Sequence, residues 1–128
     1  MTYELQLLLC AVALTVAQLL VAVPGAILQV GLPPLAGNRE GLPEITGWAG
    51  RANRAHKNML ESLGLFAVLV LVGHAAGKTN AMTTLGAEIF LWARLAFAVI
   101  YVAGIPWLRT GAWAVAMGGL VLMFVQLI

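Results

Sequence analysis

Ionisable side chains crowd into one short segment of an otherwise apolar chain, and their spacing follows the turn of an α-helix. The segment runs from Arg51 to Glu61 and reads RANRAHKNMLE. At roughly 100° per residue, four polar side chains fall within an arc of about 80°. These are Arg51, Arg54, Asn58 and Glu61, with Lys57 beside them. Because guanidinium forks bind carboxylates and phosphates, this stripe predicts an anion site with one acid for a cationic group.

Later residues add more positive charge. Arg94 and Tyr101 are seven residues apart and share a helix face, and Arg109 opens the last apolar segment. Ion pairs that hold helices together, Glu61 with Arg54 or with Arg94, would leave most of the cations unpaired. An anion with a single cationic group would balance the charge, and glutathione has two carboxylates, one ammonium and a thiol. For Glu61 itself, helix pairing and ligand contact are equally open.

The composition is that of a membrane protein. Of 128 residues, 62% are hydrophobic and 9% are charged, against about 25% charged in soluble domains, and the mean hydropathy is +0.96. A net charge of +2 without a basic run argues against nucleic acid as a partner. The chain has no aspartate and one cysteine, which excludes a Ser-His-Asp triad and an internal disulfide. His56 and His74 lack further ligands, so no metal site is expected.

Four apolar segments are long enough to cross a bilayer as helices. We expect these helices at about residues 5–29, 48–76, 81–102 and 110–128, in a single all-α transmembrane domain of residues 1–128. No basic residue precedes the first segment, so it is expected to be a retained helix rather than a signal peptide, and to carry no acid. Near the end of the second segment, Gly73 and Gly77 fit a close-packed helix contact.

Four crossings place the loops after the first and third helices on one side of the membrane. That side holds Arg39, Arg51 and Arg109, whereas the other holds Lys78. The positive-inside rule therefore predicts a multi-pass protein with both termini outward and the arginine-rich pocket open to the cytoplasm. In a bacterium the membrane would be the inner, cell membrane.

The polar stripe, with Arg94, Tyr101 and the later segment Pro-Trp-Leu-Arg109-Thr110, resembles the MAPEG family, membrane-associated proteins in eicosanoid and glutathione metabolism. It is most similar to the short, bacterial-type, microsomal glutathione transferase-like members. The resemblance covers nearly the whole chain and implies a four-transmembrane-helix bundle that forms a homotrimer. It also implies glutathione as co-substrate, bound between subunits near the cytoplasmic face.

The resemblance further implies roles for single residues. Arg109 matches the catalytic arginine that holds the glutathione sulfur as a thiolate, and Glu61 matches the residue at the glutathione amine. The other residues expected to bind glutathione are Arg51, Arg54, Lys57, Asn58, Arg94, Tyr101 and Thr110. Two departures are Gly64-Leu65, where a proline is usual, and Trp113, where prostaglandin-making members have a tyrosine. Eicosanoid specificity is therefore not supported.

Three functions follow as hypotheses. The first is a glutathione-dependent transferase or peroxidase that acts on hydrophobic electrophiles arriving from membrane lipid. The second is a non-catalytic membrane scaffold or ligand-presenting protein that uses the same pocket. The third, a proton-coupled exporter, is disfavoured because such exporters place a glutamate in a first helix that is here expected to carry no acid.

Overall fold

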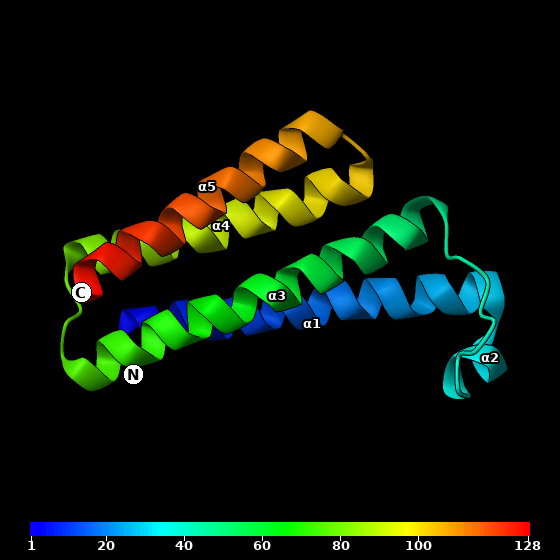
Figure 1. The fold of residues 1–128 in the computed structure, drawn as a ribbon, viewed down its shortest axis with the longest axis horizontal. Helices are drawn as coiled ribbons and strands as arrows, with labels where there is room; N and C mark the ends of the chain where they lie inside the picture. Colours follow the sequence, from blue (N-terminus) through cyan, green and yellow to red (C-terminus); the bar gives the residue numbers. More distant parts are fainter.

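The structure is a computed structural model that describes all 128 residues, and all of its regular secondary structure is α-helical. The four long helices are α1 Tyr3–Val30, α3 Gly47–Ala76, α4 Ala81–Ala103 and α5 Pro106–Leu127, and a short helix, α2 Leu32–Ala36, follows α1 (Figure 1). Each long helix is long and apolar enough to cross a membrane. The chain is therefore an integral, multi-pass, all-α membrane protein, as its hydropathy predicts.

The first helix begins earlier than predicted and contains an acid. α1 starts at Tyr3 because the Thr2 side chain caps it, which places Glu4 in its first turn. The expectation that this helix carries no acid is wrong. Glu4 is 4% exposed, and its Oε1 accepts hydrogen bonds from the hydroxyls of Thr83 at 2.6 Å and Thr84 at 2.9 Å. Glu4 thereby joins the start of α1 to the start of α4.

Prolines act differently at two places along the chain. The last helix begins at Pro106 rather than at Thr110, because proline has a suitable φ for the first helical position and needs no partner for an N–H group there. In α1 the helix continues through Pro24 to Val30. The start of α5 therefore carries Arg109 within its first turn and holds that side chain close to the end of α4.

The long helices pack as two antiparallel hairpins, α1 with α3 and α4 with α5 (Figure 1). Gly86 and Gly119 allow α4 and α5 to approach closely, since a Cβ at either would lie within 2.7 Å of the other's carbonyl oxygen. Gly73 contacts Leu127, but Gly77 ends α3 with a φ of +66° and has no neighbour there. The prediction that Gly77 forms a helix contact is therefore wrong.

The two hairpins share one apolar core. The rings of Phe66 on α3 and Phe90 on α4 stack with centroids 4.3 Å apart, and Met59, Val70 and Met123 are buried around them. Both chain termini lie at the same end of the bundle (Figure 1). At this end, which we call the terminal end, the bonds of Glu4 join the two hairpins. The opposite end, which carries the loop after α1 and the turn after α4, holds the predicted site.

Candidate functional site

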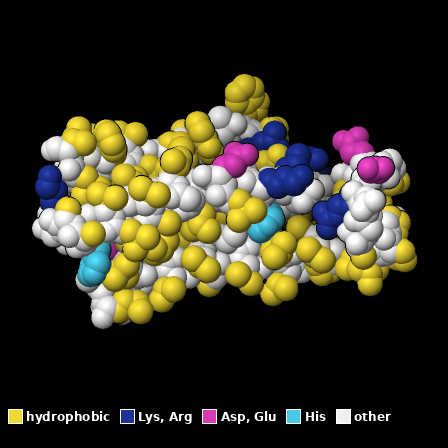
Figure 2. Space-filling view, turned by 60° about the horizontal axis from the view of Figure 1, so that its bottom comes forward, with side chains coloured by type: hydrophobic (Ala, Val, Ile, Leu, Met, Phe, Trp, Pro, Cys, Tyr) yellow, Lys and Arg dark blue, Asp and Glu magenta, His cyan; other side chains and the backbone are white.

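The predicted site residues gather at the end of the bundle that lies opposite the termini. They come from the first half of α3, the second half of α4 and the first turn of α5. In a space-filling view, most Lys and Arg side chains lie toward this end, and a single basic group lies at the other (Figure 2). The antiparallel order of α3, α4 and α5 explains this gathering, because it brings residues far apart in sequence to the same level of the bundle.

Tyr101 lies at the centre of the outer part of the site. Its hydroxyl accepts a hydrogen bond from Arg54 Nε at 3.3 Å, and the Arg109 guanidinium carbon lies 4.5 Å from the centre of its ring. A cation over an aromatic face is attracted by the ring quadrupole. The phenol thus holds two arginines from two different helices beside each other, although like charges repel.

Arg94 occupies the inner part of the site and is 1% exposed. Its Nη1 donates to Asn58 Oδ1 at 2.8 Å, and its guanidinium carbon lies 4.1 Å from the centre of the Phe97 ring. Arg94 Nε and Nη2 have no hydrogen-bond partner. A buried guanidinium normally pairs with a carboxylate, because burial of an unpaired charge is costly. The N–H groups on these two nitrogens have no partner within the chain.

Phe97 connects the two parts of the site, and sequence reasoning missed it. The centroid of its ring lies 5.3 Å from that of Tyr101, and the Arg94 guanidinium lies over the same Phe97 ring. The two rings are tilted by 59°, and each has an arginine over it. This cation–aromatic series of Arg94, Phe97, Tyr101 and Arg109 runs from the core toward the end of the bundle. The three-residue and four-residue spacing along α4 carried this signal, but phenylalanine in an apolar helix is usually a core residue.

Glu61 forms neither of the ion pairs considered from the sequence. Arg54 donates to Tyr101, while Arg94 donates to Asn58 and leaves its other nitrogens without partners. Glu61 and Arg54 are instead exposed on α3, in a helix long and apolar enough to span the membrane. Charges are not stable against lipid, so they face a protein interior or a water-filled cavity. We therefore expect protein or water, rather than lipid, to lie against this face of α3.

Two of the predicted ligand residues also have contacts within the chain. Arg51 Nε donates to the Val102 carbonyl at 2.9 Å and lies beside Gly104, where it satisfies a carbonyl in the last turn of α4. Thr110 is exposed, and its hydroxyl donates to the Pro106 carbonyl at 3.2 Å. Arg51 thus fixes the end of α4, and through it the position of Tyr101.

Lys57 lies apart from the Tyr101 group. It lines a cavity of about 660 Å³ between α1, α2, the loop after α2 and α3, together with Arg39, Asn53 and His56. His56 is 8% exposed, and its Nδ1 has no partner. Helix α3 therefore has two polar faces rather than one. At about 100° per residue Asn53 and His56 fall outside the arc of the polar stripe, and a cavity at those positions depends on the path of the loop.

One comparison with known proteins identifies a family. The family model of the MAPEG family matches residues 5–128, a range that includes every predicted site residue. No curated protein and no solved structure matches the chain significantly. Four membrane-spanning helices with an arginine-rich polar cluster agree with this match. The chain belongs to the MAPEG family.

Proposed function

We propose that this protein is a membrane-embedded, glutathione-dependent transferase or peroxidase that activates the glutathione thiol toward hydrophobic electrophiles. The observation that carries the proposal is Arg94, a fully buried arginine with two free donors and no carboxylate partner. An anionic ligand would satisfy those donors. Of the known members of the MAPEG family, some are glutathione transferases and peroxidases, so glutathione is the anion that the family favours.

The inner part of the site, together with Arg54, would bind the ligand, and Arg109 in the outer part would activate it. Arg94 and Arg54 would take the carboxylates of glutathione through paired N–H donors, and Glu61 would take its ammonium. Arg109 lies at the end of the cation–aromatic series, where it would hold the sulfur as a thiolate. A cation about 4 Å from a thiolate contributes up to about 4 kcal/mol at an effective dielectric constant of 20. This interaction would lower the pKa of the thiol and raise the fraction of glutathione present as the thiolate, which is the nucleophile.

The exposed charges on α3 support a site that is completed by a second copy of the chain. Arg54, Lys57 and Glu61 are all exposed in the single chain, although α3 is one of the candidate membrane-spanning helices. In a cyclic assembly, one face of each subunit meets a different face of the next. The homotrimer implied by the family resemblance would cover these charges and enclose glutathione between subunits.

Calorimetric titration tests the binding step. Glutathione is titrated into the detergent-purified protein and into Glu61→Gln, with Glu40→Gln, exposed in the loop, as the matched control. We expect saturable binding that Glu61→Gln weakens and Glu40→Gln does not. Absence of binding to the unmodified protein would overturn the proposal and leave the arginine cluster for a different anion.

A ligand-presenting protein without catalysis is the second candidate. The observation that favours it is the position of Arg109, whose guanidinium lies over the Tyr101 ring and is therefore already held by a contact within the chain. The two functions differ in one measurement, the rate at which purified protein conjugates glutathione to chlorodinitrobenzene. In that reaction the sulfur forms a bond to the ring carbon, and chloride leaves. A rate well above the spontaneous one excludes the presenting role, and the spontaneous rate excludes the transferase.

A further inference from the structure

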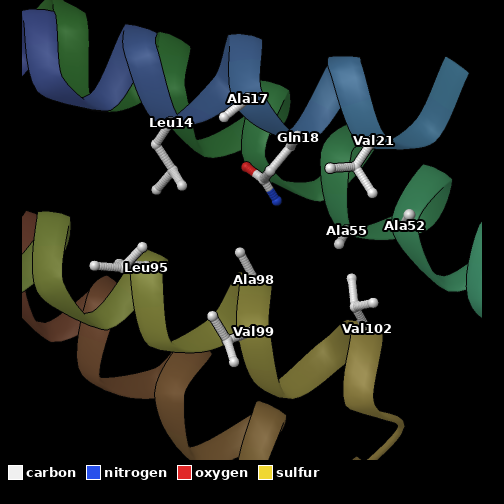
Figure 3. A pocket seen from close by; sticks show the side chains of 10 residues that line it. All are labelled: Leu14, Ala17, Gln18, Val21, Ala52, Ala55, Leu95, Ala98, Val99 and Val102. Atoms are coloured by element: carbon white, nitrogen blue, oxygen red, sulfur yellow. The ribbon is translucent and has the colours of Figure 1, made fainter. Parts of the chain in front are cut away.

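A separate cavity lies between the two hairpins, away from the charged cluster. It has a volume of about 360 Å³, within the range of small-molecule sites. Ten residues from α1, α3 and α4 line it, and nine are hydrophobic. Figure 3 shows their side chains around a gap between the helices, with the amide of Gln18 directed into it. Gln18 is the one polar residue in this lining.

The Gln18 amide is largely buried in the wall of this cavity and has no hydrogen-bond partner in the chain. The residue is 8% exposed, its Oε1 is buried without a hydrogen bond, and its Nε2 donates none. Gln18 lies near the midpoint of α1, about 20 Å along the axis from either end, so bulk water is distant in a membrane. An unsatisfied amide in such a place costs several kcal/mol. The amide thus indicates a ligand group that pairs with it.

Water does not explain the amide. A buried water is stable where it finds two to four polar partners, and this cavity offers one amide. An ion does not fit either, because no charged residue lines the cavity. A hydroxyl group fits well, since it donates to Oε1 and accepts from Nε2–H at the same time. The nine apolar residues would hold the hydrocarbon part of the same molecule.

We propose that this cavity binds a neutral hydrophobic alcohol, a long-chain molecule whose single hydroxyl group pairs with Gln18. The site does not depend on glutathione, because the arginines, Glu61 and Tyr101 are absent from its lining. It does adjoin the charged cluster at one point. The Val102 side chain lines the cavity, while its carbonyl accepts from Arg51.

Photolabelling in phosphatidylcholine nanodiscs tests this site on the full chain. The probes are a diazirine-bearing long-chain alcohol and the alkane of the same length without the hydroxyl. We expect the alcohol to label residues 14–21 and 95–102, and to label them at a lower concentration than the alkane. Equal labelling by both probes would overturn the proposal, because the cavity would then be a groove for any acyl chain.

Two variants locate the interaction. Gln18→Leu removes both hydrogen bonds, and a net contribution of about 1 kcal/mol from each predicts a roughly 30-fold loss of alcohol affinity without loss of alkane affinity. Ala98→Leu fills the cavity and reduces labelling by both probes, whereas Ala114→Leu, exposed on α5, is the matched control. If Gln18→Leu leaves the alcohol affinity unchanged, or if no label reaches the cavity because another subunit covers it, the proposal fails. The comparison of the two probes on the unmodified protein decides the question even where a variant does not fold.

Discussion

The terminal end and the site end of the bundle each bury a charged side chain, but the two side chains differ in how completely they are hydrogen bonded. Glu4 at the terminal end accepts from two threonine hydroxyls. Arg94 at the site end donates one hydrogen bond, and two of its nitrogens have no partner. A fully bonded buried charge stabilises a fold, whereas a partly bonded one is costly until a ligand arrives. Glu4 therefore joins two helices, whereas we propose that Arg94 binds a ligand.

The largest effect is expected at the outer part of the site end. Arg109→Ala should lower the rate of glutathione conjugation by roughly 10²- to 10³-fold, the usual effect of removing one group that stabilises developing negative charge. Glutathione binding should change little, because other residues hold the carboxylates. The measurements are the conjugation rate and the ultraviolet absorbance of the thiolate after glutathione is added. An unchanged thiolate signal in Arg109→Ala would contradict the role given to this residue.

The second-largest effect is expected at the inner part of the site end. Arg94→Met should weaken glutathione binding by roughly 10- to 100-fold, because charge-assisted hydrogen bonds contribute about 1.5–3 kcal/mol each. The free energy of unfolding should change by less than about 1 kcal/mol, since the lost bond to Asn58 is offset by removal of a partly bonded charge. Calorimetry and unfolding in sodium dodecyl sulfate measure the two quantities. A large loss of stability with unchanged binding would make Arg94 a structural residue.

The same substitution logic at the terminal end predicts the opposite result. Glu4→Leu should lower the free energy of unfolding by about 1–3 kcal/mol, because two hydroxyls lose their acceptor. Glutathione binding should be unchanged, since Glu4 lies in the first turn of α1, at the end of the bundle opposite the loop after α1 and the turn after α4 (Figure 1). Glu40→Leu, in the exposed loop, is the matched control. If Glu4→Leu binds glutathione more weakly under conditions where the variant is fully folded, the two ends are coupled.

The sequence is sufficient to predict the features of the fold that depend on one helix at a time. Hydropathy predicts four membrane-spanning helices, and helical periodicity predicts that Arg94 and Tyr101 share a face, which the cation–aromatic series through Phe97 agrees with. Errors arose at helix ends. Thr2 and Pro106 start their helices earlier than hydropathy indicates, because capping and proline geometry act on one or two residues.

Features that depend on two helices could not be predicted from one sequence. The bond from Arg94 to Asn58, the approach of Gly86 to Gly119 and the cavity at Gln18 all require knowledge of which faces meet. A glycine on an apolar helix is equally compatible with a close contact and with lipid exposure. For this reason the sequence pattern wrongly predicts a helix contact at Gly77 and does not indicate the close approach at Gly86.

The smallest effect concerns the helix that both ends share. α4 begins at the terminal end with a capping box, in which Asn80 Oδ1 accepts from the backbone N–H groups of Met82 and Thr83, and the Thr83 hydroxyl accepts from the N–H of Asn80. Asn80→Ala should lower the free energy of unfolding by about 1 kcal/mol, the usual value of such a cap. Thr83 is also one of the two donors to Glu4, so loosening this turn should weaken that bond as well.

A double-mutant cycle between Asn80→Ala and Glu4→Leu measures this coupling. Because both act on Thr83, their effects on unfolding should be less than additive by about 0.5 kcal/mol or more. Asn80→Ala paired with Arg94→Met should be additive, since these residues lie at opposite halves of α4 and share no partner. Additivity in the first pair would mean that the cap and Glu4 act separately. Coupling in the second would mean that α4 transmits strain from the terminal end to the site, and the two ends could then not be treated as independent.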